Sequence, residues 1–138
     1  MNVRRKLRRE EGAAAVEFAL VVGLLAVLLF GLLEYGLAFW QVQNLRAAAR
    51  EGARVAAVGG DDADIRAAME AAAVGSLSGG WTYSASDTCD EDSQGDPVTL
   101  TIDNGSLSGA VHEAFVVSIP FIPQITLDPT LSGTFRCE

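Results

Sequence analysis

The sequence predicts an α+β protein in which one long N-terminal helix, partly embedded in a membrane, carries a small extracytoplasmic domain with one short helix and a few antiparallel strands. Three observations predict this fold: a basic N-terminus, an apolar run directly behind it, and an acidic remainder with short strand-like segments. The expected boundaries are residues 1–12 for the basic leader, 13–58 for the long helix with 18–40 in the membrane, and 59–138 for the outer domain.

Charge is distributed unevenly along the chain. Residues 1–12 contain five basic and two acidic side chains, whereas residues 59–138 contain two basic and thirteen acidic ones. Such asymmetry indicates that the two ends lie in different compartments. Binding to nucleic acid needs clustered Lys and Arg, and the only such cluster abuts an apolar run. We therefore expect no nucleic acid among the partners of this protein.

The apolar segment from Phe18 to Trp40 is long enough to cross a bilayer. As a helix at about 1.5 Å per residue, it exceeds the roughly 30 Å of hydrocarbon. The basic cluster before it is expected to stay cytoplasmic, and Tyr35, Phe39 and Trp40 to lie near the outer interface. A cleaved secretory signal is disfavoured because its apolar core is typically shorter, about 7 to 15 residues. An ordinary signal anchor fits the hydropathy equally well.

The first turns of this segment contain a carboxylate, Glu17, within the pattern GAAAVEF of residues 12–18. A carboxylate is costly in hydrocarbon, so Glu17 is expected to need a partner. The alternative is that it lies at the cytoplasmic interface, where it snorkels or suits a helix N-terminus. Glu34, near the outer interface, is expected to be solvated.

The helix is expected to continue beyond the membrane, because residues 41–58 are rich in alanine and other strong helix formers. From Ala13 to Val58 it would be about 69 Å long. Basic side chains recur every four residues along one face: Arg46, Arg50 and Arg54. Glu51 lies three residues before Arg54, a spacing at which the two can pair. Small residues spaced by four offer a face for close packing of another helix: Ala15, Ala19 and Gly23.

The basic leader ending in Gly12, followed by a helix with Glu17 at its fifth residue and Phe18 at its sixth, resembles the processing site of type IV prepilin-like proteins. The resemblance implies that a prepilin peptidase cuts between Gly12 and Ala13. It also implies that the carboxylate of Glu17 pairs with the new amino terminus of a neighbouring subunit. Cleavage would remove the basic leader, so that a subunit could be lifted out of the bilayer.

The combination of GAAAVEFALV, LLFGLLEYG and NLRAAAREGARVAAV within residues 4–75 resembles the TadE-like subunits, with their TadG-like relatives, of tight-adherence pilus systems. The REGAR element downstream of a prepilin-type start is the specific part. Phe18 stands where a tyrosine often follows the glutamate, and keeps its aromatic character. The resemblance implies a minor pseudopilin of a Flp or type IVb-like pilus. Its partners would be a prepilin peptidase, other pilin or pseudopilin subunits, the assembly platform and the membrane.

The outer domain is expected to begin with a second helix and to continue with strands. Gly59–Gly60 ends the long helix, and Asp61 supplies the N-cap of the next one. Within that helix, Arg66 and Glu70 are expected to face water four residues apart. Short runs bounded by turn residues predict strands at Trp81–Ser86, Val98–Ile102, Phe115–Ile119 and Gly133–Cys137, and Asn104–Gly105 predicts a tight turn.

Cys89 and Cys137, the two cysteines of the chain, lie in the part expected to be outside, where disulfides persist. A bridge between them would add roughly 4 kcal/mol in the chain-entropy model, and reduced thiols are the alternative. Zinc is disfavoured because two Cys and His112 fall short of a four-ligand site. The acidic loop of residues 87–96 is interpreted as solvated, because a calcium loop would place Glu where Thr101 stands. We expect no metal and no cofactor.

No catalytic constellation is recognisable. The sequence has no G-x-S-x-G motif and no phosphate-binding loop, and His112 has no obvious triad partners. We therefore expect no catalytic residue and no small-molecule substrate. A secreted enzyme would also need cleavage after the apolar run.

Two interpretations therefore remain open for the whole chain. The first is a single-pass protein of the cytoplasmic membrane, with its N-terminus inside and its domain outside, that enters a surface pilus. The second is a permanent anchor displaying a binding or accessory module, which keeps its leader and needs no partner for Glu17. In either case Phe121-Ile122-Pro123 could form an exposed apolar lip for a partner, although core or edge packing is the commoner fate of such residues.

Overall fold

A computed structural model of the 138-residue chain describes residues 3–74, 77, 80–87, 89, 92–107, 115–119 and 123–138. Side chains are described from Gly12 onward. Some residues singled out above therefore lie outside the described ones: the basic side chains of the leader, Asp90 and Glu91 of the acidic loop, His112, Phe121 and Ile122.

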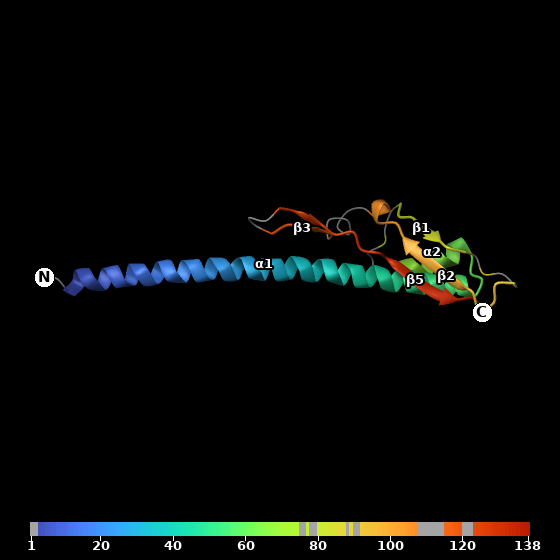
Figure 1. The fold of residues 1–138 in the computed structure, drawn as a ribbon, viewed down its shortest axis with the longest axis horizontal. Coiled ribbons are helices and arrows are strands. Elements are labelled where there is room, and N and C mark those ends of the chain that lie inside the picture. Colours follow the sequence, from blue (N-terminus) through green and yellow to red (C-terminus); the bar gives the residue numbers. More distant parts are fainter. Residues whose placement is uncertain are drawn as a thin grey trace.

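One helix, α1, dominates the molecule and extends far beyond the domain that it carries (Figure 1). It comprises the 55 residues Val3–Ala57 and is therefore about 80 Å long. It begins ten residues before Ala13 and passes through Gly12 and Ala13 without a break. The described part of the expected leader is thus continuous with the helix. Residues 12–57 form a helix long and apolar enough to cross a membrane.

The rest of the described chain forms a small α+β domain on the C-terminal half of α1 (Figure 1). Its elements are α2 (Asp62–Ala72), β1 (Tyr83–Ala85), β2 (Pro97–Ile102), the 3₁₀ helix η1 (Asn104–Ser106), β3 (Val116–Val117), β4 (Ile125–Thr126) and β5 (Ser132–Arg136). An antiparallel sheet has the order β1-β2-β5, and β3 pairs with β4 in a separate two-stranded sheet. The predicted α+β class is confirmed.

Four of these strands overlap the predicted segments, with β2 and β5 each beginning one residue earlier than predicted, whereas β4 was not predicted. Its sequence, between Pro123 and Pro129, alternates only weakly, and its partner β3 supplies a pairing of just two residue pairs. At Asn104–Gly105 the chain forms η1 instead of a two-residue turn. The reason is that the Asp103 carboxylate accepts a hydrogen bond from the Gly105 N–H at 3.0 Å and so caps a short helical turn.

The core of the domain lies against the outer half of α1. The residues that this half of the helix buries are mostly small: Ala38, Gln41, Val42, Leu45, Ala48, Ala49, Gly52, Ala53, Ala56 and Ala57. A side chain at Gly133 of β5 would collide with the backbone of Arg50, and one at Gly52 would collide with Met69 of α2. Small residues therefore let the sheet and α2 approach the helix axis closely.

The second helix is capped as predicted, since the Asp61 side chain accepts a hydrogen bond from the Asp64 N–H at 2.9 Å. Its buried residues are Ile65 and Met69. Glu70 is exposed as expected, but Arg66 is half-buried and does not simply face water. The prediction for Arg66 was wrong because aromatic residues in and next to β1 cover its side chain.

Candidate functional site: the membrane half of the N-terminal helix

The N-terminal half of α1, residues 12–37 and called the membrane half below, presents an apolar surface that the rest of the described chain covers only near Gly31. Between Gly12 and Leu37 no residue is buried. Large side chains such as Phe18, Leu20 and Leu32 are about 70% exposed. An apolar surface of this size does not persist in water, so this half of the helix requires lipid or other protein chains around it.

Glu17 lies on this surface with its side chain exposed. Among the side chains that the structure describes, none forms a hydrogen bond or ion pair with it. Phe18 beside it is 71% exposed. The predicted need of Glu17 for a partner is therefore not met by the described part of its own chain.

The small-residue face formed by Ala15, Ala19 and Gly23 is also accessible. All three residues are exposed, and a Cβ added at Gly23 would meet no atom within 4 Å. At 100° per residue, this face lies roughly 100° around the helix from Ala38, which the domain buries. The domain of the same chain therefore does not obstruct close approach of a second helix.

The expected processing site, Gly12 and Ala13, is exposed helical backbone. A Cβ at Gly12 would likewise meet nothing within 4 Å. Glycine costs about 1 kcal/mol relative to alanine inside a helix, so this position is a weak point of an otherwise strongly helical segment. The same cost applies at Gly23, Gly31 and Gly36 of α1, so it does not single out the expected cleavage site.

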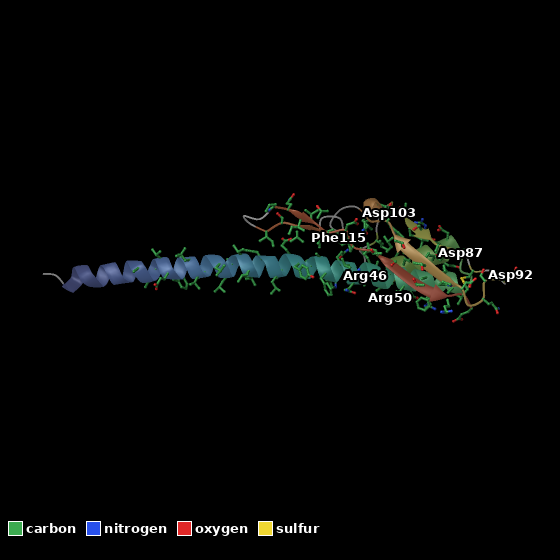
Figure 2. The ribbon with its side chains drawn as sticks, in the orientation of Figure 1. Arg46, Arg50, Asp87, Asp92, Asp103 and Phe115 are labelled. Carbon is green, nitrogen blue, oxygen red and sulfur yellow. A yellow bond between two sulfur atoms is a disulfide. The ribbon has the colours of Figure 1, made fainter. Side chains whose placement is uncertain are left out.

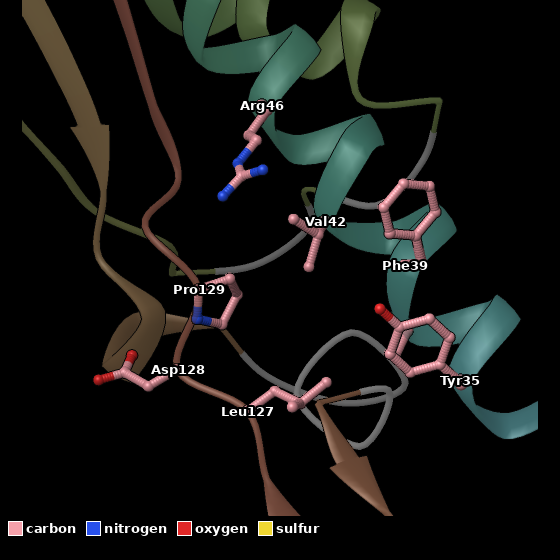
Figure 3. Close-up of a pocket in the computed structure, with 8 residues that line it drawn as sticks. Tyr35, Phe39, Val42, Arg46, Leu127, Asp128 and Pro129 are labelled. Carbon is pink, nitrogen blue, oxygen red and sulfur yellow. The ribbon is translucent and has the colours of Figure 1, made fainter. Parts of the chain in front are cut away.

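A shallow, mostly apolar pocket of about 260 Å³ lies between α1 and the chain after β4 (Figure 3). It is lined by Tyr35, Ala38, Phe39, Val42, Arg46, Leu127, Asp128 and Pro129. Its two charged groups already hold the segment in place, because Arg46 Nε donates to the Thr130 carbonyl at 3.0 Å and Asp128 accepts from Asn104 at 2.7 Å. No thiol, imidazole or amine is found among these lining residues, so the pocket suits apolar contact.

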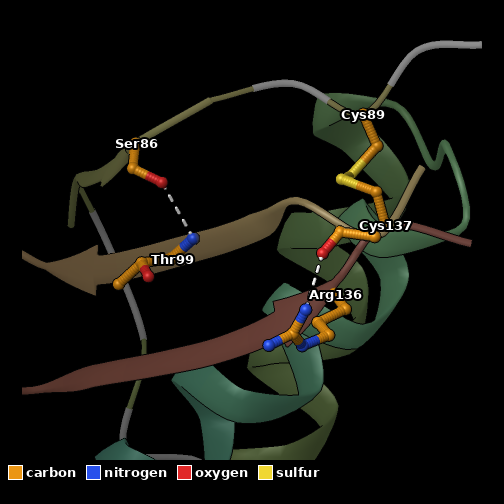
Figure 4. The surroundings of a disulfide bond; sticks show 6 residues. Ser86, Cys89, Thr99, Arg136 and Cys137 are labelled. Carbon is orange, nitrogen blue, oxygen red and sulfur yellow. Dashed lines mark hydrogen bonds between the residues drawn. A yellow bond between two sulfur atoms is a disulfide. The ribbon is translucent and has the colours of Figure 1, made fainter. Parts of the chain in front are cut away.

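The far end of the domain is closed by the predicted disulfide, Cys89–Cys137, with the two Cα atoms 5.5 Å apart (Figure 4). Cys137 is buried and follows β5, whereas Cys89 lies beyond β1. The backbone of Cys137 also donates to Asp96 and accepts from Gly95, each at 2.9 Å. The bridge therefore ties the segment after β1 to the sheet near the C-terminus of α1.

An aromatic and charged cluster joins α2 to β1. The guanidinium carbon of Arg66 lies 5.1 Å from the ring centre of Trp81 and 5.2 Å from that of Tyr83. Arg66 also pairs with Asp62 at 2.9 Å, and the Tyr83 hydroxyl donates to the same carboxylate at 2.6 Å. Trp81 Nε1 donates to Glu70 at 3.2 Å. Every partner is supplied by the fold itself, so the cluster is structural.

The pKa values of this cluster follow from these contacts. Burial, and then the hydrogen bond to Asp62, raises the pKa of the Tyr83 hydroxyl to about 12. The Tyr83 hydroxyl, followed by the Arg66 guanidinium, lowers the pKa of Asp62 below its ordinary value. Within the part of the chain that the structure describes, no group of three or more His, Cys, Asp or Glu could hold a metal ion.

The three arginines predicted to share a face of α1 have different roles. Arg54 pairs with Glu51, as their spacing predicted. Arg46 is half-buried against the segment after β4, and Arg50 is exposed (Figure 2). Sequence reasoning missed that this part of α1 forms one wall of the domain core. The available signal was the helical spacing of Leu45 and the alanines and glycine that follow it.

Comparison with known proteins relates the chain to one family. Residues 12–54 match the family model of TadE-like proteins, so the resemblance predicted from the sequence is confirmed over this segment. The match begins at Gly12, includes Glu17 and the whole apolar run, and ends at Arg54 of the REGAR element. The matched segment is 43 of the 138 residues. No curated protein and no solved structure matches the chain.

Proposed function

We propose that this chain is a minor pseudopilin-like subunit for assembly of a tight-adherence pilus, cut by a prepilin peptidase between Gly12 and Ala13 and packed into the assembly through α1. One observation carries the proposal. The segment that matches TadE-like proteins, residues 12–54, contains the apolar half of α1 that the described remainder of the chain leaves uncovered except near Gly31. An exposed helix of this kind suits an element that exchanges lipid for other helices.

Glu17 supplies the specific interaction in this proposal. Cleavage after Gly12 would create a positively charged amino terminus at Ala13, one helical turn from Glu17 along α1. The two charges of one chain lie about 6 Å apart along the axis, so an axially shifted neighbour can place its amino terminus beside Glu17. In a low-dielectric environment such a pair offsets the cost of burying the carboxylate, and it fixes the register of the two helices.

The basic leader has a separate role before assembly. Its five basic residues would hold the N-terminus in the cytoplasm and orient the domain outward. The disulfide Cys89–Cys137 supports this orientation, because such bonds persist in oxidising compartments outside the cytoplasm. Removing the leader would eliminate the charges that oppose extraction of α1 from the bilayer. The face of Ala15, Ala19 and Gly23 would then be available for helix packing.

The test compares two carboxylates of the same apolar run. Glu17→Ala should leave the protein synthesised, inserted and processed, but should abolish its incorporation into the pilus, because the neighbouring amino terminus loses its partner. Glu34→Ala is the matched control, and it should assemble as the unmodified chain does. Incorporation is measured by immunoblotting of sheared pili against the membrane fraction.

Normal incorporation of the Glu17→Ala chain would contradict the proposed pairing. If the leader also stayed intact in cells with an active prepilin peptidase, the chain would be a permanent single-pass anchor. Its outer domain would then act as a binding or accessory module at the membrane surface.

A further inference from the structure

The β3–β4 hairpin, here residues 115–119 and 123–127, lies along α1 on the side facing the N-terminus (Figure 1). Its root is in the domain core, where Phe115 is buried and its carbonyl accepts a hydrogen bond from the Leu127 N–H at 2.8 Å. Farther out, Ile119 Cδ1 would lie 3.4 Å from a Cβ added at Gly31. The hairpin therefore extends from the domain to a point inside the apolar run of α1.

The composition of this region differs from that of the rest of the domain. Residues 114–127 contain no charged side chain, and their only polar residues are Ser118, Gln124 and Thr126. Ile125 is 50% exposed, and Pro123 is exposed too. Only two residue pairs join β3 to β4, and an isolated two-stranded hairpin is marginal in water. The hairpin thus has apolar surface to bury and gains stability from a further surface.

Acidic side chains gather at the opposite end of the domain. Asp87 and Asp92 lie near the C-terminal end of α1, far from the hairpin (Figure 2). The Glu138 N–H bonds to the Ala57 carbonyl at this end, whereas Ile119 lies beside Gly31. These two positions are about 39 Å apart along the helix. Asp87 and Asp92 thus lie at the end of the domain away from the apolar hairpin, whereas Asp128 directly follows the hairpin and lines the pocket beside Tyr35.

We propose that the β3–β4 hairpin is an interfacial membrane contact that rests in the outer leaflet at the boundary between headgroups and acyl chains. In that position it fixes how deeply α1 is inserted. The outer edge of the hydrocarbon then lies near Leu33, and about 20 residues, 14–33, cross the roughly 30 Å of hydrocarbon. The proposal requires only that α1 crosses a membrane, so it applies equally to a pilus subunit and to a permanent anchor.

The pattern of buried and exposed residues on α1 favours an outer hydrocarbon edge near Leu33 over one at Trp40. Gly31 and Glu34 are half-buried while Leu32 and Leu33 are exposed, so the hairpin side of the helix is already covered at this level. If hydrocarbon reached Trp40, Ile119 would lie about 13 Å inside it. The unpaired strand edges of the hairpin would then lack hydrogen-bond partners, which hydrocarbon does not tolerate.

The positions of Glu17 and Glu34 also agree with an outer hydrocarbon edge near Leu33. With the outer edge at Leu33, Glu34 lies among the headgroups, where water can solvate its charge. Glu17 then lies about 5 Å inside the inner edge, which is near enough for snorkelling before assembly. A hydrocarbon layer ending at Trp40 would place Glu34 about 9 Å inside and leave Phe18 and Leu20 outside at the other end.

The experiment measures paramagnetic attenuation of backbone amide signals in the full chain, reconstituted in phosphatidylcholine nanodiscs at one chain per disc. Three probes are compared: phosphatidylcholine labelled with doxyl at acyl carbon 5, the same lipid labelled at carbon 16, and a water-soluble gadolinium chelate. The hairpin amides of Val117 and Ile125 should be attenuated severalfold more by the carbon-5 probe than by the carbon-16 probe. The amide of Phe135 in β5 should respond to the gadolinium chelate instead.

Matched variants test the contribution of the hairpin side chains. Ile125→Asp should reduce the carbon-5 attenuation of the hairpin severalfold, whereas Phe135→Asp should leave it unchanged. Both positions are exposed strand residues, at 50% and 40%. Ile125→Leu keeps the apolar contact and should preserve the attenuation.

Hairpin amides that respond to gadolinium as strongly as Phe135 would overturn the proposal. Stronger attenuation by the carbon-16 probe would contradict the interfacial depth. Gadolinium protection that appears only when several chains share one disc would mean that a second copy covers the hairpin, and would also overturn the assignment to lipid. Each of these results leaves the pairing of Glu17 in the pilus to its own test.

Discussion

The two halves of α1 bury their apolar residues in different ways. Leu25 in the membrane half is 57% exposed, whereas Leu45 in the outer half is completely buried. The outer half has its partners in the same chain, namely α2 and the β1-β2-β5 sheet. The membrane half has none among the described residues apart from the hairpin near Gly31. A single continuous helix thus has one half that packs in the core of its own chain and one half whose apolar side chains have almost no partner in the described chain.

The sequences of the two halves reflect this difference. The membrane half contains large Leu, Val and Phe side chains around its circumference, which fluid acyl chains can accommodate. The outer half instead places Ala and Gly on its buried face, because a sheet with Gly133 pressed against the backbone at Arg50 leaves no room for larger side chains. A folded partner requires shape complementarity, and a lipid partner requires only hydrophobicity.

The largest expected effect is a difference in the free energy of unfolding between alanine substitutions of two leucines, one in each half of α1. Leu45→Ala should lower the free energy of unfolding of the domain by about 2 to 5 kcal/mol, because it opens a cavity in the core. Leu25→Ala removes the same atoms from the membrane half and should change that free energy by less than about 0.5 kcal/mol. The measurement is denaturant unfolding in detergent micelles, followed by near-ultraviolet circular dichroism of the buried Trp81.

Equal destabilisation by the two substitutions would contradict the proposed difference between the two halves of α1. It would mean that the membrane half also packs within the folded unit. The detergent must be the same for both variants, so that the apolar run is equally covered and only the domain core differs.

A smaller effect concerns pH and the two tyrosines of the chain, Tyr83 in β1 and Tyr35 on the exposed part of α1. Below about pH 10 the Tyr83 hydroxyl is protonated in both the folded and the unfolded chain. Its pKa is raised to about 12 in the folded chain, so between these values the unfolded chain loses its proton first. Stability is therefore complete below about pH 10 and is lost progressively as the pH rises toward 12.

The pH effect is measured by repeating the unfolding experiment across this alkaline range. Tyr83→Phe should lower stability at neutral pH, because Asp62 loses a hydrogen bond, and should flatten the alkaline decline. Tyr35→Phe on the exposed part of α1 serves as control and should retain the decline. An unchanged alkaline slope in Tyr83→Phe would show that another group causes it.

Much of the fold could be predicted from local patterns. The apolar run, the Asp61 cap and the positions of β1, β2, β3 and β5 follow from residue type and spacing alone. The register of Gly133 against Arg50 and the covering of Arg66 by Trp81 and Tyr83 could not be predicted. These contacts join residues far apart in the sequence, and nothing in either segment specifies its partner.

Two features of the candidate site, Glu17 and the basic leader, stand out in the sequence alone. Glu17 is conspicuous because a charge inside an apolar run is costly, and the leader before Gly12 is recognisable by its charge. The hairpin beside Gly31 was not foreseen, because β4 is only two residues long and its sequence does not reveal that it folds back along the membrane half of α1. The role of Glu17 stays a prediction, whereas a contact between two distant segments has no signal in either of them.

Intact-mass and N-terminal sequencing of the protein from its native membranes tests the central claim most directly. A mature chain that begins at Ala13, with or without a methyl group, is the expected result, and it would establish prepilin-type processing. A chain that retains residues 1–12 in cells with an active prepilin peptidase would contradict the claim. In that case the membrane half of α1 would be a permanent anchor, and Glu17 an interfacial carboxylate.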